Sequence, residues 1–478
     1  MNLQTDDQLA LRGRAMECMG HMAVAVEKEA FRPYFQETMK RCAESLQVDS
    51  TELHEYAFAV FANLSKVMGR EFSPVLPELV PHVLKIIQES DGLISEEEAK
   101  ENGELSDLAM PQGQGPQGGG QKQQQQLQAF DDSDAESDEE DEDKRYVVRT
   151  AMLDAKKCAI TALGEMAGHC EADFLPYLET SMETLKNASE YWHPTIVEET
   201  LGVLPSLVVC SIAGHHANAD GDGDGDGDGA KVPFENGEIG EASPMSAHTA
   251  AVCAAVMNVI VPFLDGNEAS TVSAACSAIQ SVLELCGPHA LIPHATFVLP
   301  ILLDLAKSKH KCQELEEGLS LEANTYQDEE DDEEDHDNYM TSTMDLIGAI
   351  ARIMGQHFNQ FLPQFLEPIA NFCKTSRPTA DRSMGQGAIA ELAQGCKEGV
   401  LPFFETVFYP VIMSGLADKE NSVRRNAAFA AGTICEEVSF FVFGVFLGCF
   451  WGVFGVLLGC FWGAFGVFLV VLRLAPSA

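Results

Sequence analysis

The alternation of apolar and polar residues is most regular between residues 150 and 212, where it predicts helices. From Thr150 to His169, apolar side chains recur every three or four positions, which places them on one side of an α-helix. A Phe-Leu-Pro-Tyr-Leu turn follows, and Pro176 suits the first turn of a new helix because its missing N–H has no partner there. The second helix runs to about Asn187, and Pro194 opens a third.

This unit of two helices and one turn recurs along the chain. Self-similarity at a period of about 40 residues is typical of stacked helical hairpins, and the turns at Phe31 and Phe72 lie 41 residues apart. We therefore predict an all-α fold, a right-handed α-solenoid of about seven and a half helical hairpins. The copies of the turn begin at Phe31, Phe72, Phe174, Pro288, Phe361 and Leu401.

The first helix, within residues 1–29, has no partner helix before it. Leu11, Ala15, Met19, Met22 and Val26 share one face of this helix, and we expect that face to be the buried one. A solenoid end also needs a polar cap, which is missing here. We therefore expect the chain to begin in mid-repeat and to be a piece of a longer protein.

Composition divides the chain into hairpins and inserts. We expect helical hairpins in 1–89, 146–213 and 245–438, the last of these carrying an acidic loop at 319–338. Residues 90–145 combine a Gln/Gly run with an acidic run, and 214–244 contain a Gly-Asp repeat. Both segments have little apolar surface to bury, so we expect them to be disordered.

Charge limits the class of partner. The chain has 30 Lys and Arg against 74 Asp and Glu, a formal net charge of −44, which argues against nucleic acid and favours basic proteins. Two acidic runs interrupt hairpins, and insertions in solenoids collect on one face, often the binding face. An alternative is that these runs are solvated loops that only aid solubility. The candidate cargo-binding residues are Asp131, Asp132, Asp134, Glu136, Asp138, Glu139, Glu140, Asp141, Glu142, Asp143, Asp328, Glu329, Glu330, Asp331, Asp332, Glu333, Glu334 and Asp335.

Two motifs within the inserts suggest further chemistry. Ser133 and Ser137 each precede an acidic residue by three positions, so both are candidates for an acid-directed kinase. A calcium-loop spacing also occurs, but a Gly-Asp repeat matches it by chance, and Lys231 and Pro233 do not suit the loop. We expect no metal site there. The spacing is formed by Asp224, Asp226, Asp228, Gly229 and Glu235.

Nothing in the sequence indicates an enzyme. It contains no nucleophile elbow, phosphate-binding loop, dinucleotide loop or paired-histidine motif, so we expect neither catalysis nor a cofactor. The 14 cysteines form no C-x-x-C pair, and we expect buried thiols in a reducing compartment.

The helix near residue 421 begins with a pattern typical of the second helix of a solenoid hairpin. Val423 and Ala427 are expected to pack inward. Arg424 is expected to reach a carboxylate or carbonyl of the neighbouring repeat and to hold the repeats together.

The end of the chain, residues 439–478, is an apolar, Gly-rich tail. Phe440 to Leu472 contains no charged residue over 33 positions, which is long enough to span a bilayer, and its glycines form one stripe, as in packed membrane helices. Its 11-residue repetition also fits translated repetitive DNA or an intron that was read through. A membrane is a partner only if this tail is genuine.

One family resemblance covers residues 8 to 436. The order of an acidic insert (AFDDSDAESDEEDED), a helix (LDAKKCAITALGEMAGHC) and the turn FLPYLE, together with DKENSVRRNAAFAAG, resembles the HEAT repeats of importin-β-superfamily nuclear transport receptors. The resemblance implies carriage of basic cargo such as histones or ribosomal proteins, shuttling between cytoplasm and nucleus, binding to Phe-Gly nucleoporins, and release by Ran-GTP. The family's amino-terminal Ran-GTP site has no counterpart here. The alternative function is an acidic HEAT scaffold or histone chaperone without transport activity.

Overall fold

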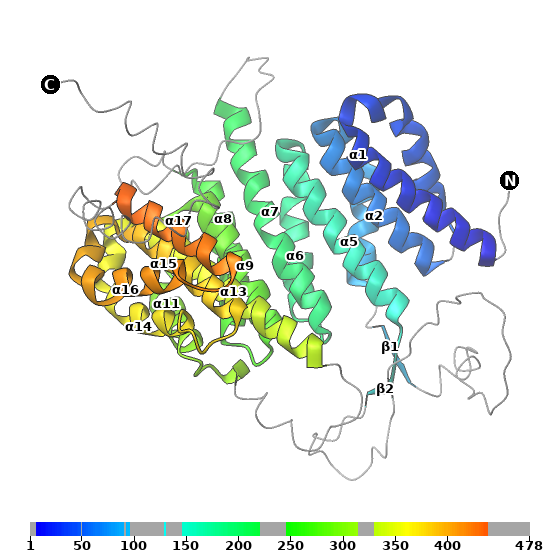
Figure 1. Ribbon diagram of the computed structural model, residues 1–478. Coiled ribbons are helices and arrows are strands. Elements are labelled where there is room, and N and C mark those ends of the chain that lie inside the picture. Colours follow the sequence, from blue (N-terminus) through cyan, green and yellow to red (C-terminus); the bar gives the residue numbers. More distant parts are fainter. Residues whose placement is uncertain are drawn as a thin grey trace, which may run out of the picture. The chain divides into compact units, whose positions relative to one another are not determined.

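The computed structural model describes residues 6–48, 50–89, 92–95, 129–130, 146–219, 245–313 and 329–437. The chain forms two compact units. Unit 1 comprises Met1–Glu235, Ala242–Ile301 and His310–Ser342, and unit 2 comprises Asn236–Glu241, Leu302–Lys309 and Thr343–Ala478. Each unit is a stack of helical hairpins and is described by itself (Figure 1).

In unit 1, long helices alternate with shorter helical segments, and consecutive long helices pack side by side (Figure 1). The elements are α1 (Asp6–Ser45), α2 (Thr51–Met68), η1 (Gly69–Val75), α3 (Leu76–Gln88), α5 (Thr150–His169), η3 (Glu171–Tyr177), α6 (Leu178–Ser189), α7 (Pro194–Ala219), α8 (Ala247–Ile260), η4 (Val261–Asp265), α9 (Ala269–Cys286) and α10 (Pro288–Leu291). The predicted α-solenoid of hairpins is confirmed.

Unit 2 continues the same alternation. Its elements are η5 (Gly355–Gln360), α14 (Leu362–Phe372), α15 (Thr379–Cys396), η6 (Lys397–Phe403), η7 (Phe404–Phe408), α16 (Tyr409–Leu416) and α17 (Asn421–Glu437). Two helices, α11 (Ala295–Ala306) and α13 (Glu329–Met354), have residues in both units.

A buried residue anchors each turn between a long helix and the short helix after it. Phe31, Phe72 and Phe174 occupy this place and are at most 2% exposed. The sequence analysis put Phe361 at the equivalent position, which is wrong by three residues: Phe358 is fully buried, and α14 begins at Leu362. The Phe-Leu-Pro string at 361–363 imitates the turn, but its proline belongs to the first turn of α14.

A residue with positive φ lies just before the buried anchor at the ends of α2, α5, α9, α13 and α15, and at the kink inside α1. Glycine takes this place at 69, 287 and 355, whereas Glu27, Glu171 and Lys397 take it elsewhere. A non-glycine residue held in such a sparsely populated region of backbone space costs roughly 1–3 kcal/mol. The three non-glycine residues are therefore strained.

Replacing Lys397 by glycine is expected to stabilise unit 2 by about 1 kcal/mol, because the removed strain exceeds the added chain entropy of glycine. The lost contact with Glu437, 4.0 Å long and solvent-exposed, contributes little. Urea unfolding of the full chain measures the gain. Thr375→Gly, at an exposed position where φ is not positive, is the control and should give no gain.

The N-terminal helix differs from the prediction in its buried face. Leu11 and Met22 are 68% and 49% exposed, whereas Met16 and Ala23 are buried. Glycines on the buried side decide this outcome: a Cβ on Gly13 would lie 2.3 Å from the Tyr56 ring, so the absent side chain lets α1 approach α2 closely. The apolar stripe read from sequence is therefore the exposed one.

The base of the first insert contains strands that were not predicted. Strands β1 (Leu93–Ser95), β3 (Tyr146–Val148) and β2 (Ala129–Phe130) form an antiparallel sheet in the order β1-β3-β2, with Leu93 opposite Val148. Leu-Ile and Tyr-Val-Val are good strand formers, which explains the pairing. Two of these strands, Leu93–Ser95 and Ala129–Phe130, lie within the 90–145 segment that was expected to be disordered. Apart from Gly92, the rest of 90–145 lies outside the described residues.

The third acidic run is helical rather than a loop from Glu329 onwards, because α13 begins there. Acidic residues are favoured in the first turns of a helix by its dipole. Three segments lie outside the described residues: 220–244, 314–328 and the tail from 438. The predicted calcium-loop spacing lies in the first of them, and the membrane-length apolar run lies in the tail.

Polar contacts join neighbouring hairpins at about the repeat period. In unit 1, the Arg32 guanidinium donates to Glu71 at 2.6 Å. In unit 2, Arg382 donates to Asp418 at 2.8 and 3.0 Å. Val423 and Ala427 are buried, as predicted. Arg424 instead bonds the Asp418 carbonyl at 2.6 Å within its own hairpin, so the predicted contact between repeats is made by Arg382.

Candidate functional site

A groove of about 380 Å³ runs between α5 and α7 in unit 1. It lies between two long helices that pack side by side, and polar side chains predominate in its lining. Such a groove can hold side chains of an extended segment. It is lined by Lys157, Thr161, Gly164, Glu165, Thr195, Glu198, Glu199, Gly202, Val203 and Ser206.

Two glycines shape the groove. A Cβ on Gly164 would lie 2.6 Å from the Val203 Cβ, so only glycine lets α5 and α7 come this close. Gly202 is exposed, and nothing lies within 4 Å of the place where its Cβ would be. The first glycine sets the width of the groove and the second leaves its surface open.

The groove carries an excess of carboxylates. The Thr161 hydroxyl donates to Glu199 at 2.5 Å, which orients that carboxylate. Glu165 lies 2.9 Å from His169, and the hydrogen bond from that imidazole lowers the Glu165 pKa. Three glutamates and one lysine line the groove, so it favours a cation.

Two further carboxylates, Glu55 and Asp154, do not line the groove but lie near the Cys158 thiol, as does Glu199 of the groove. Burial raises the pKa of Glu55, and the charges of Asp154, Glu52 and Glu17 raise it further. Burial likewise raises the Asp154 pKa. The Cys158 thiol between these groups has its pKa raised to about 12, first by burial and then by Glu55, Asp154 and Glu199, so it is unreactive at neutral pH. A bound cation would relieve this crowding.

The side chains of the predicted cargo-binding residues lie outside the described part of the structure. Of these, the residues outside the described part of the chain are Asp131–Asp143, which include Ser133 and Ser137, and Asp328. For residues 329–335 the structure describes the backbone, which forms the start of α13. The prediction rested on runs of consecutive acidic residues. It therefore did not include four acidic residues that are dispersed over three helices, Glu55, Asp154, Glu198 and Glu199. Their positions near the starts of consecutive long helices could have revealed them.

In the described part of the chain, no group of three His, Cys, Asp or Glu side chains could hold a metal ion. By length and composition alone, four described stretches could cross a membrane: Pro194–Gly214, Ala247–Asp265, Ala269–Cys286 and Thr379–Leu416. In Pro194–Gly214, 72% of the apolar window is buried within the protein, so packing accounts for its hydrophobicity.

Stacked hairpins with an acidic groove between long helices define a HEAT-type solenoid of the kind that binds extended polypeptides. A scan against protein-family models finds none that matches the chain. Similar proteins include "Probable importin subunit beta-4" of Schizosaccharomyces pombe, 26% identical over 90% of this chain, and importin-4 of Homo sapiens, also 26% identical over 90%. The chain is therefore similar over most of its length to importins, which are nuclear transport receptors of the importin-β superfamily.

Solved structures share this fold. The structure of the karyopherin Kap121p bound to the SUMO protease Ulp1p matches over 96% of this chain, with a TM-score of 0.62 and 15% identity. Kap121p bound to Nup53p matches over 90%, with a TM-score of 0.56. The chain spans 38% and 36% of the two curated relatives and 38% of the first Kap121p chain.

Proposed function

We propose that this chain acts in nuclear import by holding basic segments of cargo proteins, such as histones or ribosomal proteins, in the α5–α7 groove. The observation that carries the proposal is the acidic lining of a groove that Gly202 leaves open, formed by Glu165, Glu198 and Glu199. Glu55 and Asp154 lie near the same Cys158 thiol as Glu199. A Lys or Arg side chain lying there would neutralise carboxylates that burial and mutual repulsion disfavour. The acidic runs at 131–143 and 328–335 would attract the same cargo at longer range.

The relatives support a role in transport. Those that match the chain are importins, and Kap121p has been solved with proteins bound, among them Pho4p and Nup53p. We infer that this chain shuttles between cytoplasm and nucleus and that it binds Phe-Gly nucleoporin repeats. A stretch of unit 1 suits such repeats: residues 287–301 contain no charged residue, and Ile292 and Phe297 are 68% and 42% exposed.

Retention on immobilised Phe-Gly repeats tests the transport role. The full chain is expected to be retained, and Ile292→Ser with Phe297→Ser should lower retention about tenfold, because a few exposed apolar anchors carry most of such binding. Leu11→Ser with Met22→Ser, which also removes two exposed apolar side chains, is the control and should be retained normally.

The second candidate function, an acidic scaffold or histone chaperone, is favoured by the net charge of −44 alone. It predicts binding of basic proteins without any binding to Phe-Gly repeats. If the repeats hold no more of the full chain than of an unrelated acidic solenoid, this second function replaces the transport role.

A further inference from the structure

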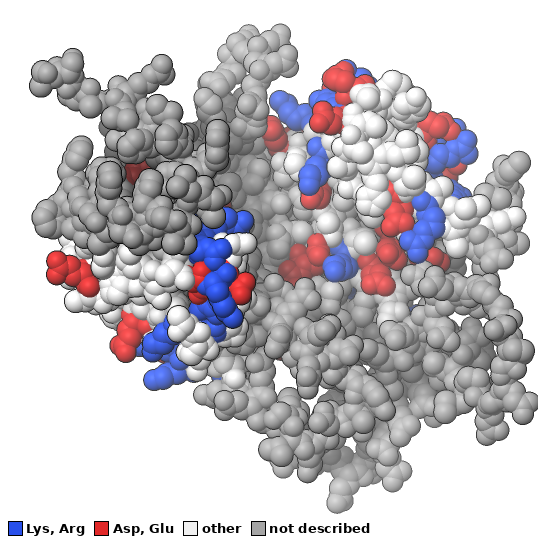
Figure 2. All heavy atoms as spheres, viewed as in Figure 1, with Lys and Arg blue, Asp and Glu red and all other residues white. Residues whose placement is uncertain are grey.

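Unit 2 has a basic surface, although the chain as a whole is strongly acidic. Residues 374–382 and 418–425 contain six Lys or Arg and three Asp or Glu. Figure 2 shows Lys and Arg side chains gathered over unit 2. We define the basic corner as the four exposed side chains Lys374, Arg377, Lys419 and Arg425.

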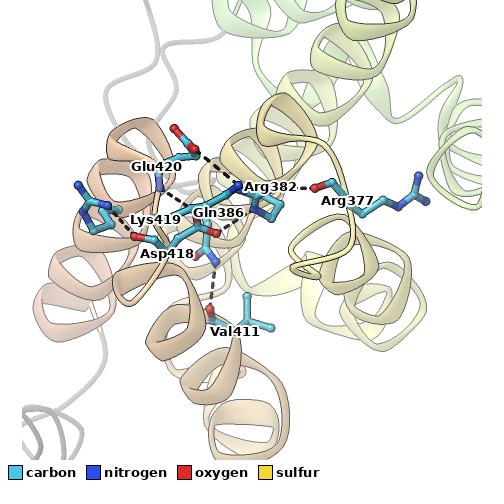
Figure 3. A network of polar contacts seen from close by, with 8 residues as sticks. Arg377, Arg382, Gln386, Val411, Asp418, Lys419 and Glu420 are labelled. Atoms are coloured by element: carbon cyan, nitrogen blue, oxygen red, sulfur yellow. Dashed lines mark hydrogen bonds and ion pairs between the residues drawn. The ribbon is translucent and has the colours of Figure 1, made fainter.

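A buried ion pair fixes the two turns that carry the basic corner. Arg382 and Asp418 have side chains that are each 6% exposed and form a two-bond contact. Arg382 also donates to the Arg377 carbonyl at 2.6 Å, and Asp418 accepts from the Glu420 N–H at 2.9 Å. Figure 3 shows this network, with the Arg377 guanidinium extending away from it. The turns before α15 and α17 are therefore held side by side.

The acidic residues of these turns are already engaged, whereas two of the four cations of the basic corner make no ion pair and a third makes only a long one. Asp418 is bonded to Arg382, and Asp381 lies 3.5 Å from Arg377. Lys419 is 83% exposed and its contact with Glu420 is 4.0 Å long. Among the described residues, Lys374 and Arg425 make no ion pair. The corner therefore presents positive charge that the protein does not itself neutralise.

We propose that the basic corner is a docking site for an acidic segment of a partner protein, separate from the groove for basic cargo. The four cations would pair with carboxylates of that segment, and the adjoining amino-terminal ends of α15 and α17 would add favourable dipole charge. The proposal does not depend on the function proposed for the α5–α7 groove.

The dimensions of the corner favour an extended segment. Neighbouring packed helices lie about 8–10 Å apart, and an extended chain advances about 3.3 Å per residue, so acidic residues three positions apart reach the two turns. Nucleic acid fits less well, because its charges continue at about 1.7 Å intervals beyond the corner and meet an otherwise acidic protein. A short segment covers the corner alone.

The test uses a fluorescent ten-residue peptide with Glu at every third position and the full-length chain. Fluorescence anisotropy at physiological salt measures its affinity, and a photo-crosslinking group on the peptide reports where it binds. For the variant Lys374→Gln, Lys419→Gln, Arg425→Gln, we expect the affinity to fall at least tenfold. We expect crosslinks within 374–382 and 418–425.

A charge-matched control separates docking from general attraction. Lys40→Gln, Lys85→Gln, Lys186→Gln removes three exposed lysines from unit 1 and should change the affinity less than twofold. The proposal is overturned if both variants lose affinity equally, if the wild-type chain binds no peptide, or if crosslinks fall elsewhere. Equal competition by a duplex DNA of the same charge would reassign the corner to nucleic acid and overturn it as well.

Discussion

Replacing Asp418 by alanine is expected to destabilise the packing of α15 against α17 by about 3 kcal/mol. The substitution leaves the Arg382 guanidinium buried without its carboxylate, and breaking a buried pair costs about 3–5 kcal/mol. We expect the lower end because the pair lies at a turn. The hydrogen bond from Arg382 holds the Asp418 pKa below its usual range, so this stability is present above the ordinary Asp pKa and is lost as the pH falls below it.

Hydrogen exchange of the α15 and α17 amides measures this loss locally, as a fall of about 100-fold in protection. The double variant Arg382→Met, Asp418→Ala should recover much of the protection, because it leaves no unpaired charge. Arg41→Ala, which removes an exposed pair with Glu37, is the control and should have little effect. A loss no larger than that of Arg41→Ala would mean that the buried pair does not hold the two helices together.

Reversing the charges at the groove, by Glu198→Lys with Glu199→Lys, is expected to weaken binding of a lysine-rich peptide about 100-fold, because repulsion replaces attraction in a partly buried groove. Gly202→Leu should weaken binding by obstruction, without disturbing the fold, because its surroundings are open. Isothermal titration calorimetry with the full chain measures both effects. Glu179→Lys with Glu183→Lys, on exposed positions of α6, is the control.

Acidity should weaken the same binding. The pKa values of Glu55 and Asp154 are raised, so these carboxylates take up protons at a higher pH than free carboxylates and lose their attraction for a cation. Affinity should therefore begin to fall at a higher pH than the ordinary pKa values of Asp and Glu would give. A further variant, with the acids of 131–143 changed to Asn and Gln, should slow association mainly at low salt. If that variant alone reduces affinity, the acidic run and not the groove is the cargo site.

The period of the turns was sufficient to predict the stacked hairpins, because each repeat places an apolar anchor such as Phe72 or Phe174 at the same point. The prediction at Phe361 was wrong because a Phe-Leu-Pro string occurs there by chance, three residues after the buried anchor Phe358. The α5–α7 groove could not be read from the sequence, since it depends on which glycine faces a neighbour and which faces solvent: Gly164 contacts Val203, whereas Gly202 contacts nothing. The basic corner could not be predicted for a related reason, because its cations come from two turns some 40 residues apart that the packing of α15 on α17 and the Arg382–Asp418 pair bring together.

The contacts between hairpins also bear on how the chain is made. Arg32 meets Glu71, Thr161 meets Glu199 and Arg382 meets Asp418, in each case after 36 to 39 residues. A ribosome adds about 5–20 residues per second, so the partner of each residue emerges within seconds, and each hairpin can pack on its predecessor while synthesis continues. Across the first insert, where Arg70 contacts Asp173 after 103 residues, the wait is more than twice as long. The junction of α3 with α5 is therefore the point at which a growing chain stays exposed longest.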